Sequence, residues 1–408
     1  MNYDELLFNR YFEDWTKLPG QKIISLLKVK TKVVLPSFES IDFSKKLKVK
    51  WGIDATAPDV HIGHLCPVLV LNIFVKTGHD VTLIIGDFTA KIGDPSGRVT
   101  ERAIMTDEQI AGNFKTYSDQ IGKYIDIPKI KVRKNSEWLS KLTASQLLAI
   151  MQQMSAAAAL QRDDFRTRIE KGSGLSLAEI CYGALVGYDS VMLNSDIELG
   201  GIDQLLNLQQ SRDVQIIHGQ KPEVIITNPI LEGLDGTGRK MSKSYGNFIA
   251  VNASTEDKFG KLMSLPDSLL LQYYKCFGYL YEDELPALEK FINEQPMEAK
   301  KQLAAYFVSL ETKSLNTGLA ERKRFENKFS KKELSADDFL VIKVKSGTTL
   351  LDALFQSAKF ASKGELKRLF AQNAIKNLDI NETCTAESAV TKPVKIKAGK
   401  LHFFSIVI

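Results

Sequence analysis

The chain has 408 residues, of which 54 are Lys or Arg and 49 are Asp or Glu, so its formal net charge is +5. Hydrophobic residues make up 44% and charged residues 25%, proportions typical of a globular protein with two or three domains. No run of about 18 apolar residues could span a membrane, and the first residues lack the basic-then-apolar pattern of a secretion signal. We therefore expect a cytoplasmic protein with no membrane contact. Its mild basicity permits a nucleic-acid partner without requiring one.

The cysteines bear on the compartment and on metal binding. All four are far apart and form no Cys-x-x-Cys motif; they are Cys66, Cys181, Cys276 and Cys384. This spacing suits a reducing compartment and argues against both a disulfide framework and a zinc ribbon.

The predicted elements change character along the chain. Up to about residue 45, apolar residues recur at helical spacing, as in YDELLFNRYFEDW and GQKIISLLK. Short apolar runs such as KLKVKWGID, HDVTLIIGD and PEVIITNP then alternate with helical patterns such as HLCPVLVLNIFVKTG. This alternation predicts an α/β protein with a parallel sheet covered on both faces. Ligands of such sheets bind beyond the carboxyl ends of the strands, which fall here at 52–54, 86–87 and 228–232.

The second half of the chain has a different pattern. Residues 255–330 are helical and rich in charge, and SKKELSADD has the composition of a linker. Residues 337–408 predict two short amphipathic helices followed by short strands.

The stretch DATAPDVHIGHL places His61 and His64 three residues apart, at the start of a predicted helix. A zinc site is disfavoured because no further ligand accompanies the pair, and we predict no metal held by side chains. Two interpretations stay open on these residues alone. The histidines are incidental, or they belong to a phosphate site in which helix N–H groups, the small Gly63 and imidazole donors face an anion.

A second candidate segment is GRKMSKSYGN, a predicted loop with glycines near both ends. Its lysines, Lys240 and Lys243, are separated by Met and Ser and could swing onto a polyphosphate. A solvated charged loop is the alternative for two lysines considered alone. The occurrence of this loop after His-Ile-Gly-His on a parallel α/β core favours the phosphate interpretation.

HIGH (61–64) and KMSKS (240–244) together resemble the signature of class I aminoacyl-tRNA synthetases. GDFTAKIGDPSGR, GYDS and ELGGIDQLLN are similar to segments of bacterial-type tyrosyl-tRNA synthetases, and SKGELKRLFAQNAIKN resembles an S4-type RNA-binding domain. The resemblance covers the whole chain. It implies a Rossmann-type catalytic domain with N-terminal helices at 1–232, the KMSKS loop and an α-helical tRNA-binding domain at 233–332, and a small α+β S4-like domain at 337–408.

The resemblance also implies an activity and roles for particular residues. Tyrosine and ATP, bound with Mg²⁺, give tyrosyl-adenylate and pyrophosphate, and the tyrosyl group then passes to the 3′ end of tRNA(Tyr). The catalytic residues that would contact the phosphates are Thr56, His61, His64, Arg98, Arg102, Lys240 and Lys243. The other residues expected to bind ATP are Asp54, Gly63, Gly201, Asp203, Met241, Ser242 and Ser244.

Tyrosine must be distinguished from phenylalanine by its hydroxyl group. A site that hydrogen-bonds this hydroxyl rejects phenylalanine by a factor of about 10⁴–10⁵. Asp189 of GYDS matches the family's acceptor for the hydroxyl. The other residues implied to bind tyrosine are Thr89, Asp94, Tyr182 and Gln204.

Four positions depart from the family pattern. Val186 replaces a glutamine that helps to bind the α-amino group, and Lys50 replaces a tyrosine that contacts the substrate hydroxyl in many members. Trp51 stands where a small residue is frequent, and Ala55 replaces a proline. We expect Lys50 to be exposed on an edge strand. The departures leave open a paralogue that activates a tyrosine analogue or another aromatic amino acid. A non-catalytic RNA-binding relative is disfavoured because both signature motifs are intact.

The C-terminal segment carries nine basic residues that suit contact with an RNA backbone. They are Lys359, Lys363, Lys367, Arg368, Lys376, Lys392, Lys395, Lys397 and Lys400. The resemblance further implies a homodimer.

Overall fold

The computed structural model describes residues 2–54, 60–94, 105–160, 163–172, 174–328, 339–360, 362–399 and 402–408. The chain divides into two compact units, residues 1–322 and 323–408. The boundaries predicted at 232–233 and 332–337 both differ from this single division, and the three-domain assignment stays a prediction. None of the described helices is long and apolar enough to cross a membrane.

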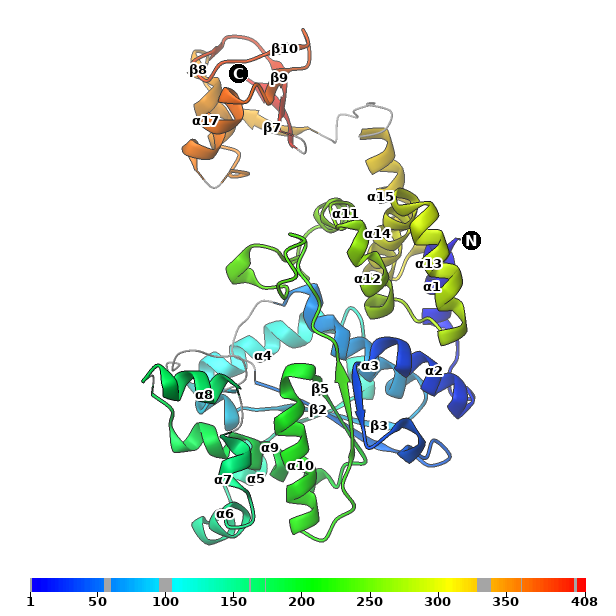
Figure 1. Ribbon diagram of the computed structural model, residues 1–408. Helices are drawn as coiled ribbons and strands as arrows, with labels where there is room; N and C mark the ends of the chain where they lie inside the picture. Colours follow the sequence, from blue (N-terminus) through cyan, green and yellow to red (C-terminus); the bar gives the residue numbers. More distant parts are fainter. Residues whose placement is uncertain are drawn as a thin grey trace. The chain divides into compact units, whose positions relative to one another are not determined.

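The first unit is built on a six-stranded sheet in the order β1-β6-β5-β2-β3-β4 (Figure 1). Neighbouring strands from β6 to β4 are parallel, and only β1 pairs antiparallel, at the edge. The prediction of a parallel α/β sheet is confirmed. The strands are β1 (Val33–Leu35), β2 (Lys48–Ile53), β3 (Asp80–Ile85), β4 (Lys131–Lys134), β5 (Ile197–Gly201) and β6 (Val224–Asn228).

Helices cover both faces of this sheet. Successive side chains of β2 point to opposite faces: Lys50 reaches the carbonyl of Val186 on α9, whereas the Trp51 ring contacts the Tyr117 ring on α4. The helices up to the end of the sheet region are α1 (Tyr3–Phe12), α2 (Gly20–Lys30), α3 (Leu65–Lys76), α4 (Asp107–Ile121), α5 (Ser136–Leu139), α6 (Ala144–Met151), α7 (Ala156–Ala159), α8 (Asp163–Glu170), α9 (Leu177–Leu193) and α10 (Leu205–Ile217).

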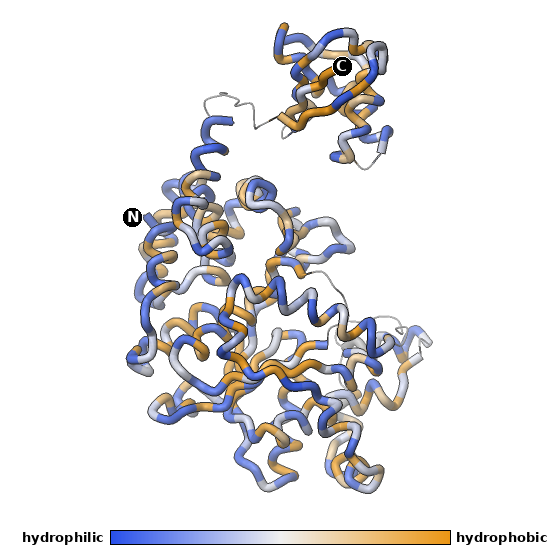
Figure 2. The backbone as a smooth tube through the Cα atoms, turned by 180° about the vertical axis from the view of Figure 1, so that it is seen from behind, coloured by the Kyte–Doolittle hydropathy of each residue, from blue (hydrophilic) through white to orange (hydrophobic). Residues whose placement is uncertain are grey.

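The strand order reverses at β2, which has β3 on one side and β5 on the other. A crevice opens at such a point because the connections leave the two neighbouring strands in opposite directions. Strands β3 and β6 are buried along almost their whole length, in agreement with their continuous hydrophobic runs. Figure 2 shows hydrophobic segments crossing the middle of the first unit. The helix α3 that follows HIGH is also buried on almost every side. The N-terminal segment was expected to be helical up to about residue 45, but it also contains the edge strand β1. This strand has only three residues and therefore gives no recognisable pattern in the sequence.

A helical layer completes the first unit. Its helices are α11 (Thr255–Met263), α12 (Leu270–Phe277), α13 (Leu285–Glu294), α14 (Pro296–Thr312) and α15 (Leu315–Glu326). The centre of this layer is α14, which packs against α1, α11, α12 and α13. Arg10 of α1 forms two hydrogen bonds with the carboxylate of Glu284, at 2.6 and 2.7 Å, and so joins the chain's beginning to this layer.

The expectation that the cysteines form no disulfides is wrong for one pair. Cys66 on α3 and Cys276 on α12 form a disulfide across 210 positions of sequence. The two helices pack against each other, and a partner so far away along the chain leaves no spacing signal. Cys181 and Cys384 are free thiols.

The second unit is a small α+β structure. Its five-stranded sheet has the order β10-β9-β12-β13-β7, and β11 pairs with β8. Two helices cover an apolar core that includes Leu354, Leu366, Phe370 and Phe404. The elements are β7 (Leu340–Lys343), β8 (Thr348–Thr349), α16 (Leu350–Phe355), α17 (Lys363–Ala371), β9 (Ile375–Asn377), β10 (Glu382–Thr383), β11 (Ala389–Val390), β12 (Val394–Ala398) and β13 (His402–Val407).

Leu366→Ala should destabilise the second unit selectively. Leu366 is fully buried in the core of that unit, and truncating such a side chain costs about 2–5 kcal/mol. Calorimetry of the full chain should show the transition of the second unit at lower temperature, with the transition of the first unit unchanged. Val341→Ala, at a position 58% exposed on β7, is the matched control and should leave both transitions in place. Equal shifts of both transitions in Leu366→Ala would contradict the division into two units.

Candidate active site

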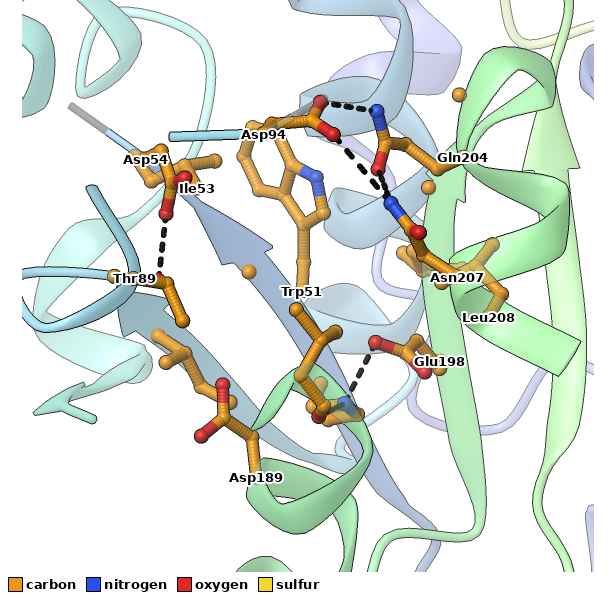
Figure 3. Close-up of a pocket in the computed structure, with 18 of the residues that line it drawn as sticks. Trp51, Ile53, Asp54, Thr89, Asp94, Asp189, Glu198, Gln204, Asn207 and Leu208 are labelled. Carbon is orange, nitrogen blue, oxygen red and sulfur yellow. Dashed lines mark hydrogen bonds and ion pairs between the residues drawn. The ribbon is translucent and has the colours of Figure 1, made fainter. Parts of the chain in front are cut away.

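A cavity of about 340 Å³ lies at the carboxyl ends of β2, β3 and β5, where the strand order reverses. Figure 3 shows Asp94, Gln204 and Asn207 together at one end of it, and Asp189 and Glu198 at the opposite end. The cavity lies where the sequence predicted the ligand site. Nine of the residues predicted for the site contribute to its lining or its hydrogen-bond network: Asp54, His64, Thr89, Asp94, Tyr182, Asp189, Gly201, Gln204 and, through its stacking on His64, His61.

HIGH forms a short 3-10 helix, η2 (Ile62–His64), immediately before α3. The backbone N–H of His61 donates to Nδ1 of His64 at 3.2 Å, and the two imidazole rings stack with centroids 3.8 Å apart. A Cβ on Gly63 would lie 3.0 Å from the His61 ring, so glycine makes this stacking possible. The space beside Gly63 is therefore filled by His61, and the predicted contact of Gly63 with ATP stays a prediction.

Both histidines are uncharged at neutral pH. Burial, the neighbouring His64 and the charges of Lys243 and Lys240 together lower the pKa of His61 to about 3. His64 lines the cavity and keeps part of its surface exposed, and desolvation of its ring lowers its pKa to about 4. Neutral imidazoles can donate an N–H to a phosphate oxygen, but they bring no positive charge to it.

The segment that follows the KMSKS loop is paired with HIGH through the backbone. The N–H of Ile62 donates to the carbonyl of Ile249 at 3.0 Å, and the N–H of Val251 donates to the carbonyl of Val60 at 2.9 Å. Segments almost 190 residues apart along the chain are thereby paired, with His61 opposite Ala250. The structure thus brings together the two motifs that the sequence analysis linked.

Asn247 anchors the loop from within. Its Oδ1 accepts the backbone N–H of Ser242 at 2.9 Å, and its Nδ2 donates to the carbonyl of Lys240 at 3.3 Å. The side chain of Met241 is buried beside this anchor. The Ser242 hydroxyl accepts the backbone N–H of Ser244, at the start of the 3-10 helix η6 (Lys243–Tyr245). Lys240 is exposed and Lys243 half-buried, so the loop is fixed while its lysines keep access to solvent.

A chain of hydrogen bonds connects carboxylates across the cavity. The Thr89 hydroxyl, in the 3-10 helix η3 (Thr89–Lys91), donates to Asp54 at 2.8 Å, and the Asn135 amide donates to Thr89 at 3.0 Å and to Asp189 at 3.3 Å. Asn135 is fixed in this orientation because its Oδ1 accepts the backbone N–H of Phe88. The Asp54 carboxylate also accepts from the Tyr182 hydroxyl at 2.9 Å.

The carboxylates at both ends titrate near neutral pH. Burial raises the pKa of Asp54 to about 7, against the opposing effect of its bonds to Thr89 and Tyr182. Burial also raises the pKa of Asp189 to about 6, although the Lys50 charge and the Trp138 indole N–H at 2.7 Å favour its ionised form. Gln204 donates to Asp94 at 2.6 Å and so holds the third carboxylate.

The GGID turn lies at the edge of the cavity. Asp203 belongs to the 3-10 helix η5 (Ile202–Gln204), and its carboxylate folds back over Gly201, where a Cβ would lie 2.3 Å from Oδ1. Gly201 is thus in contact with an acidic group that faces the cavity rim. Their predicted contact with the ribose stays a prediction.

The expectation for Lys50 is wrong. It lies on β2, a central strand, and its side chain is 1% exposed. Its ammonium is 2.6 Å from Oε1 of Glu198, the residue opposite it on β5. The alternation in KKLKVK was interpreted as a row of exposed lysines. That prediction failed because local sequence cannot reveal a buried partner on another strand.

Three predicted residues, Thr56, Arg98 and Arg102, lie outside the described part of the chain. Five residues of the site had no predicted role: Asn135, Trp138, Glu198, Asn207 and Asn247. Glu198, Asn207 and Asn247 belong to segments already singled out, so an acidic or amide residue within or beside a motif was the available signal. Asn135 and Trp138 had none. Within the described residues, no group of three His, Cys, Asp or Glu side chains could hold a metal ion.

Comparison with known proteins agrees with this geometry. Residues 43–325 match the family model of class I tRNA synthetases for tryptophan and tyrosine (W and Y). The tyrosine–tRNA ligase of Thermotoga maritima is 38% identical over 332 residues, which are 81% of this chain and 82% of the relative. That of Moorella thermoacetica is 36% identical over 414 residues, covering 97% of this chain and 99% of the relative.

Solved structures show the same fold. A C-terminally truncated mitochondrial tyrosyl-tRNA synthetase of Aspergillus nidulans superposes with a TM-score of 0.63 at 21% identity, covering 80% of this chain and 99% of that one. The tyrosyl-tRNA synthetase of Archaeoglobus fulgidus complexed with L-tyrosine gives a TM-score of 0.57 at 19% identity, covering 74% and 100%. Together with the extent of the sequence matches, the paired HIGH and KMSKS segments at the reversal of strand order mean that this chain belongs to the class I tRNA synthetases of the tryptophan and tyrosine family.

Proposed function

We propose that this chain is a tyrosine–tRNA ligase, which activates tyrosine with ATP and transfers the tyrosyl group to tRNA(Tyr). The observation that carries the proposal is the backbone pairing of the HIGH segment with the segment that follows KMSKS, above a cavity with carboxylates at both ends. One end of this cavity suits an ammonium group and the other suits a distal hydroxyl group. Tyrosine carries both.

Adenylate formation needs positioning and charge stabilisation rather than a nucleophilic side chain. The carboxylate of tyrosine attacks the α-phosphate of ATP, and pyrophosphate leaves. The neutral His61 and His64 would donate hydrogen bonds to phosphate oxygens as negative charge builds up. Lys240 and Lys243 would bind the leaving pyrophosphate with their ammonium groups, which the fixed loop presents to solvent.

We assign Mg²⁺ to the phosphates of ATP. The described residues hold no cluster of three side chains that would bind the ion without the nucleotide, and none of the steps attributed to this chain passes through the metal. The ion supplies charge neutralisation to the phosphates when it enters with ATP.

The C-terminal unit is proposed to be S4-like and to bind tRNA. Lys376 on β9 lies opposite Lys397 on β12, and Lys395 is on the same face two residues earlier. The ammonium groups of Lys395 and Lys397 lie over the rings of Phe339 and Phe403, 5.1 and 5.5 Å from the centroids. The buried rings hold these lysines on one face of the sheet, and a row of basic groups suits contact with an RNA backbone. We also propose a homodimer acting in the cytoplasm, on the family resemblance.

Amino-acid-dependent pyrophosphate–ATP exchange tests the proposed function directly. Tyrosine should support exchange, and phenylalanine should do so with a kcat/KM lower by about 10⁴-fold, because a hydroxyl-binding site left without its hydroxyl keeps unpaired polar groups. Tryptophan and ring-substituted tyrosines complete the set. If no amino acid supports exchange, the enzyme proposal fails. If phenylalanine matches tyrosine, the hydroxyl-binding role of Asp189 fails.

His64→Ala and Lys243→Ala should each lower the single-turnover rate of adenylate formation by about 10²-fold, the usual cost of removing one group that stabilises transition-state charge. Rapid-quench measurement with saturating tyrosine isolates this step. Lys221→Ala changes an exposed lysine that precedes β6 and does not line the cavity; this control should react at the wild-type rate. Unchanged rates in both site variants would contradict their assignment.

Ending the chain at residue 331 removes the strands and helices of the C-terminal unit that begin at Leu340. Pyrophosphate exchange should be retained, because every described residue of the cavity lies before that point. Aminoacylation of tRNA(Tyr) should fall by at least about tenfold, because the proposed basic RNA-binding face is lost. Full charging by the shortened chain would refute the RNA-binding role.

A further inference from the structure

The disulfide between Cys66 and Cys276 lies next to the HIGH segment, and no role assigned so far uses it. Cys66 is the second residue of α3 and follows His64 by two positions. Cys276 is the second-last residue of α12, in the helical layer. Both residues are almost fully buried, at 3% and 5% exposed. The bond therefore fixes the helix that begins at HIGH to a helix of the other layer.

The same helix, α12, also contacts the base of the KMSKS loop. The Tyr273 hydroxyl donates to the carbonyl of Glu232 at 2.7 Å. Glu232 forms an antiparallel bridge with Lys240, the first residue of KMSKS. Because Tyr273 and Cys276 are three residues apart, they lie on one face of α12. This face is therefore joined to both motifs, to HIGH by a covalent bond and to the base of the KMSKS loop by a hydroxyl group.

Other bonds hold α12 in place without the disulfide. The Tyr279 hydroxyl, just beyond α12, donates to the carbonyl of Leu69 at 3.1 Å and accepts from the Asn72 amide at 2.9 Å. The Lys30 ammonium of α2 donates to the carbonyl of Cys276 at 2.7 Å. Leu69 and Asn72 lie three and six positions farther along α3 than the disulfide. Loss of the disulfide should therefore leave the fold intact and loosen the start of α3, next to HIGH.

We propose that Cys66 and Cys276 form a redox switch for ATP binding, in which the disulfide restricts the movement of the KMSKS loop relative to HIGH and its reduction to two thiols loosens both segments. A ligand that bridges two segments has to order them when it binds. A covalent link that already restricts them lowers the entropy lost in that step. The oxidised protein should therefore bind ATP more tightly than the reduced protein. The inference rests on the proposed function, in which ATP lies between the two motifs.

The switch exchanges electrons with a small dithiol or a small disulfide. In reduction, a thiolate of the dithiol attacks one cysteine sulfur, the protein S–S bond breaks, and a mixed disulfide forms. The second thiol of the reagent then attacks its own sulfur in the mixed disulfide and releases the other cysteine. Two electrons pass to the protein, each cysteine sulfur takes up one proton, and the reagent leaves as a disulfide. Oxidation by a small disulfide is the reverse.

Both cysteines lie in terminal turns of their helices, where the local opening that admits a reagent costs least. Because the two residues are buried, exchange is slow, and the state of the switch follows lasting changes in redox conditions. A reducing compartment favours the two thiols, and oxidising conditions favour the bond.

The full-length protein, equilibrated in mixtures of reduced and oxidised dithiothreitol, provides the test. After denaturation, thiol titration should count four thiols in the reduced form and two in the oxidised form. Calorimetry with ATP and Mg²⁺, without tyrosine, should give a Kd for the oxidised form lower by at least about fivefold. By linkage, saturating ATP should shift the balance between dithiol and disulfide by the same factor.

Cys276→Ala should bind ATP as the reduced wild-type protein does, in reducing and in oxidising buffer alike. Cys66→Ala should behave in the same way and replaces the first variant should that one fail to fold. Cys384→Ala removes a free thiol of the second unit and is the control, which should keep both the bond and the difference in affinity.

Tyr273→Phe tests the route through α12. The disulfide should still form, but the ratio of the two Kd values should fall by about twofold or more, the effect of one hydrogen bond. Tyr274→Phe is the matched control, because the hydroxyl of the neighbouring Tyr274 donates to the carbonyl of Ala299 on α14, at 2.8 Å, and not to the KMSKS loop. This control should keep the wild-type ratio. A purely structural disulfide would give the same Kd in both redox forms.

The outcomes separate the two proposals. Equal ATP affinity of the two forms, weaker binding by the oxidised form, or four thiols under oxidising conditions overturns the switch. An unchanged ratio in Tyr273→Phe overturns the route through α12. These results leave the proposed function intact as long as ATP binds and tyrosine supports exchange. Absence of ATP binding and of exchange in both redox forms overturns the proposed function itself.

Discussion

Two backbone hydrogen bonds, Ile62 N–H to Ile249 O and Val251 N–H to Val60 O, hold together the two segments on which the phosphate chemistry depends. One segment begins α3, which is buried in the sheet layer, and the other leads into α11 of the helical layer. Because both bonds are made by the main chain, they fix the relative position of the motifs without using the histidine or lysine side chains. Asn247 acts in a similar way inside the loop, since its amide binds main-chain groups of Lys240 and Ser242.

The hydrogen bonding and the pKa shifts of the site arise because charged groups are buried in the crevice. Four carboxylates of the described residues line the cavity. Neutral donors such as Thr89, Gln204 and Trp138 hold three of them, and Lys50 pairs with the fourth, Glu198. Burial raises the pKa of Asp54 and Asp189 towards neutrality, whereas it makes the histidines more acidic. Both effects have one cause, because a low-dielectric environment penalises whichever form is charged. Lys50 keeps its charge although it is buried, because neighbouring acidic charges, Glu198 first among them, outweigh the effect of burial and raise its pKa.

The sequence predicted the parallel sheet, the location of the site at its carboxyl edge, and most of the residues there. Apolar strand runs and glycine–aspartate turns are local signals. HIGH and KMSKS are each short motifs of consecutive residues, so each can be recognised from local sequence. The failures have a common physical cause, because each involves a partner distant in sequence. Lys50 was expected at the surface, since nothing near it announces Glu198. The Cys66–Cys276 disulfide joins helices whose contact exists only in the fold. Asn135 and Trp138 became visible only as the neighbours of Asp189.

The two ends of the cavity differ in the pH range over which their side chains change charge. At the phosphate end, His61 and His64 have values of about 3 and 4, so their protonation hardly changes between pH 5 and 8. The carboxylates Asp54 and Asp189, at about 7 and 6, gain protons within that range. A fall in pH from 8 to 5 would therefore change the charge of the amino-acid end of the cavity while the phosphate end keeps its neutral imidazoles.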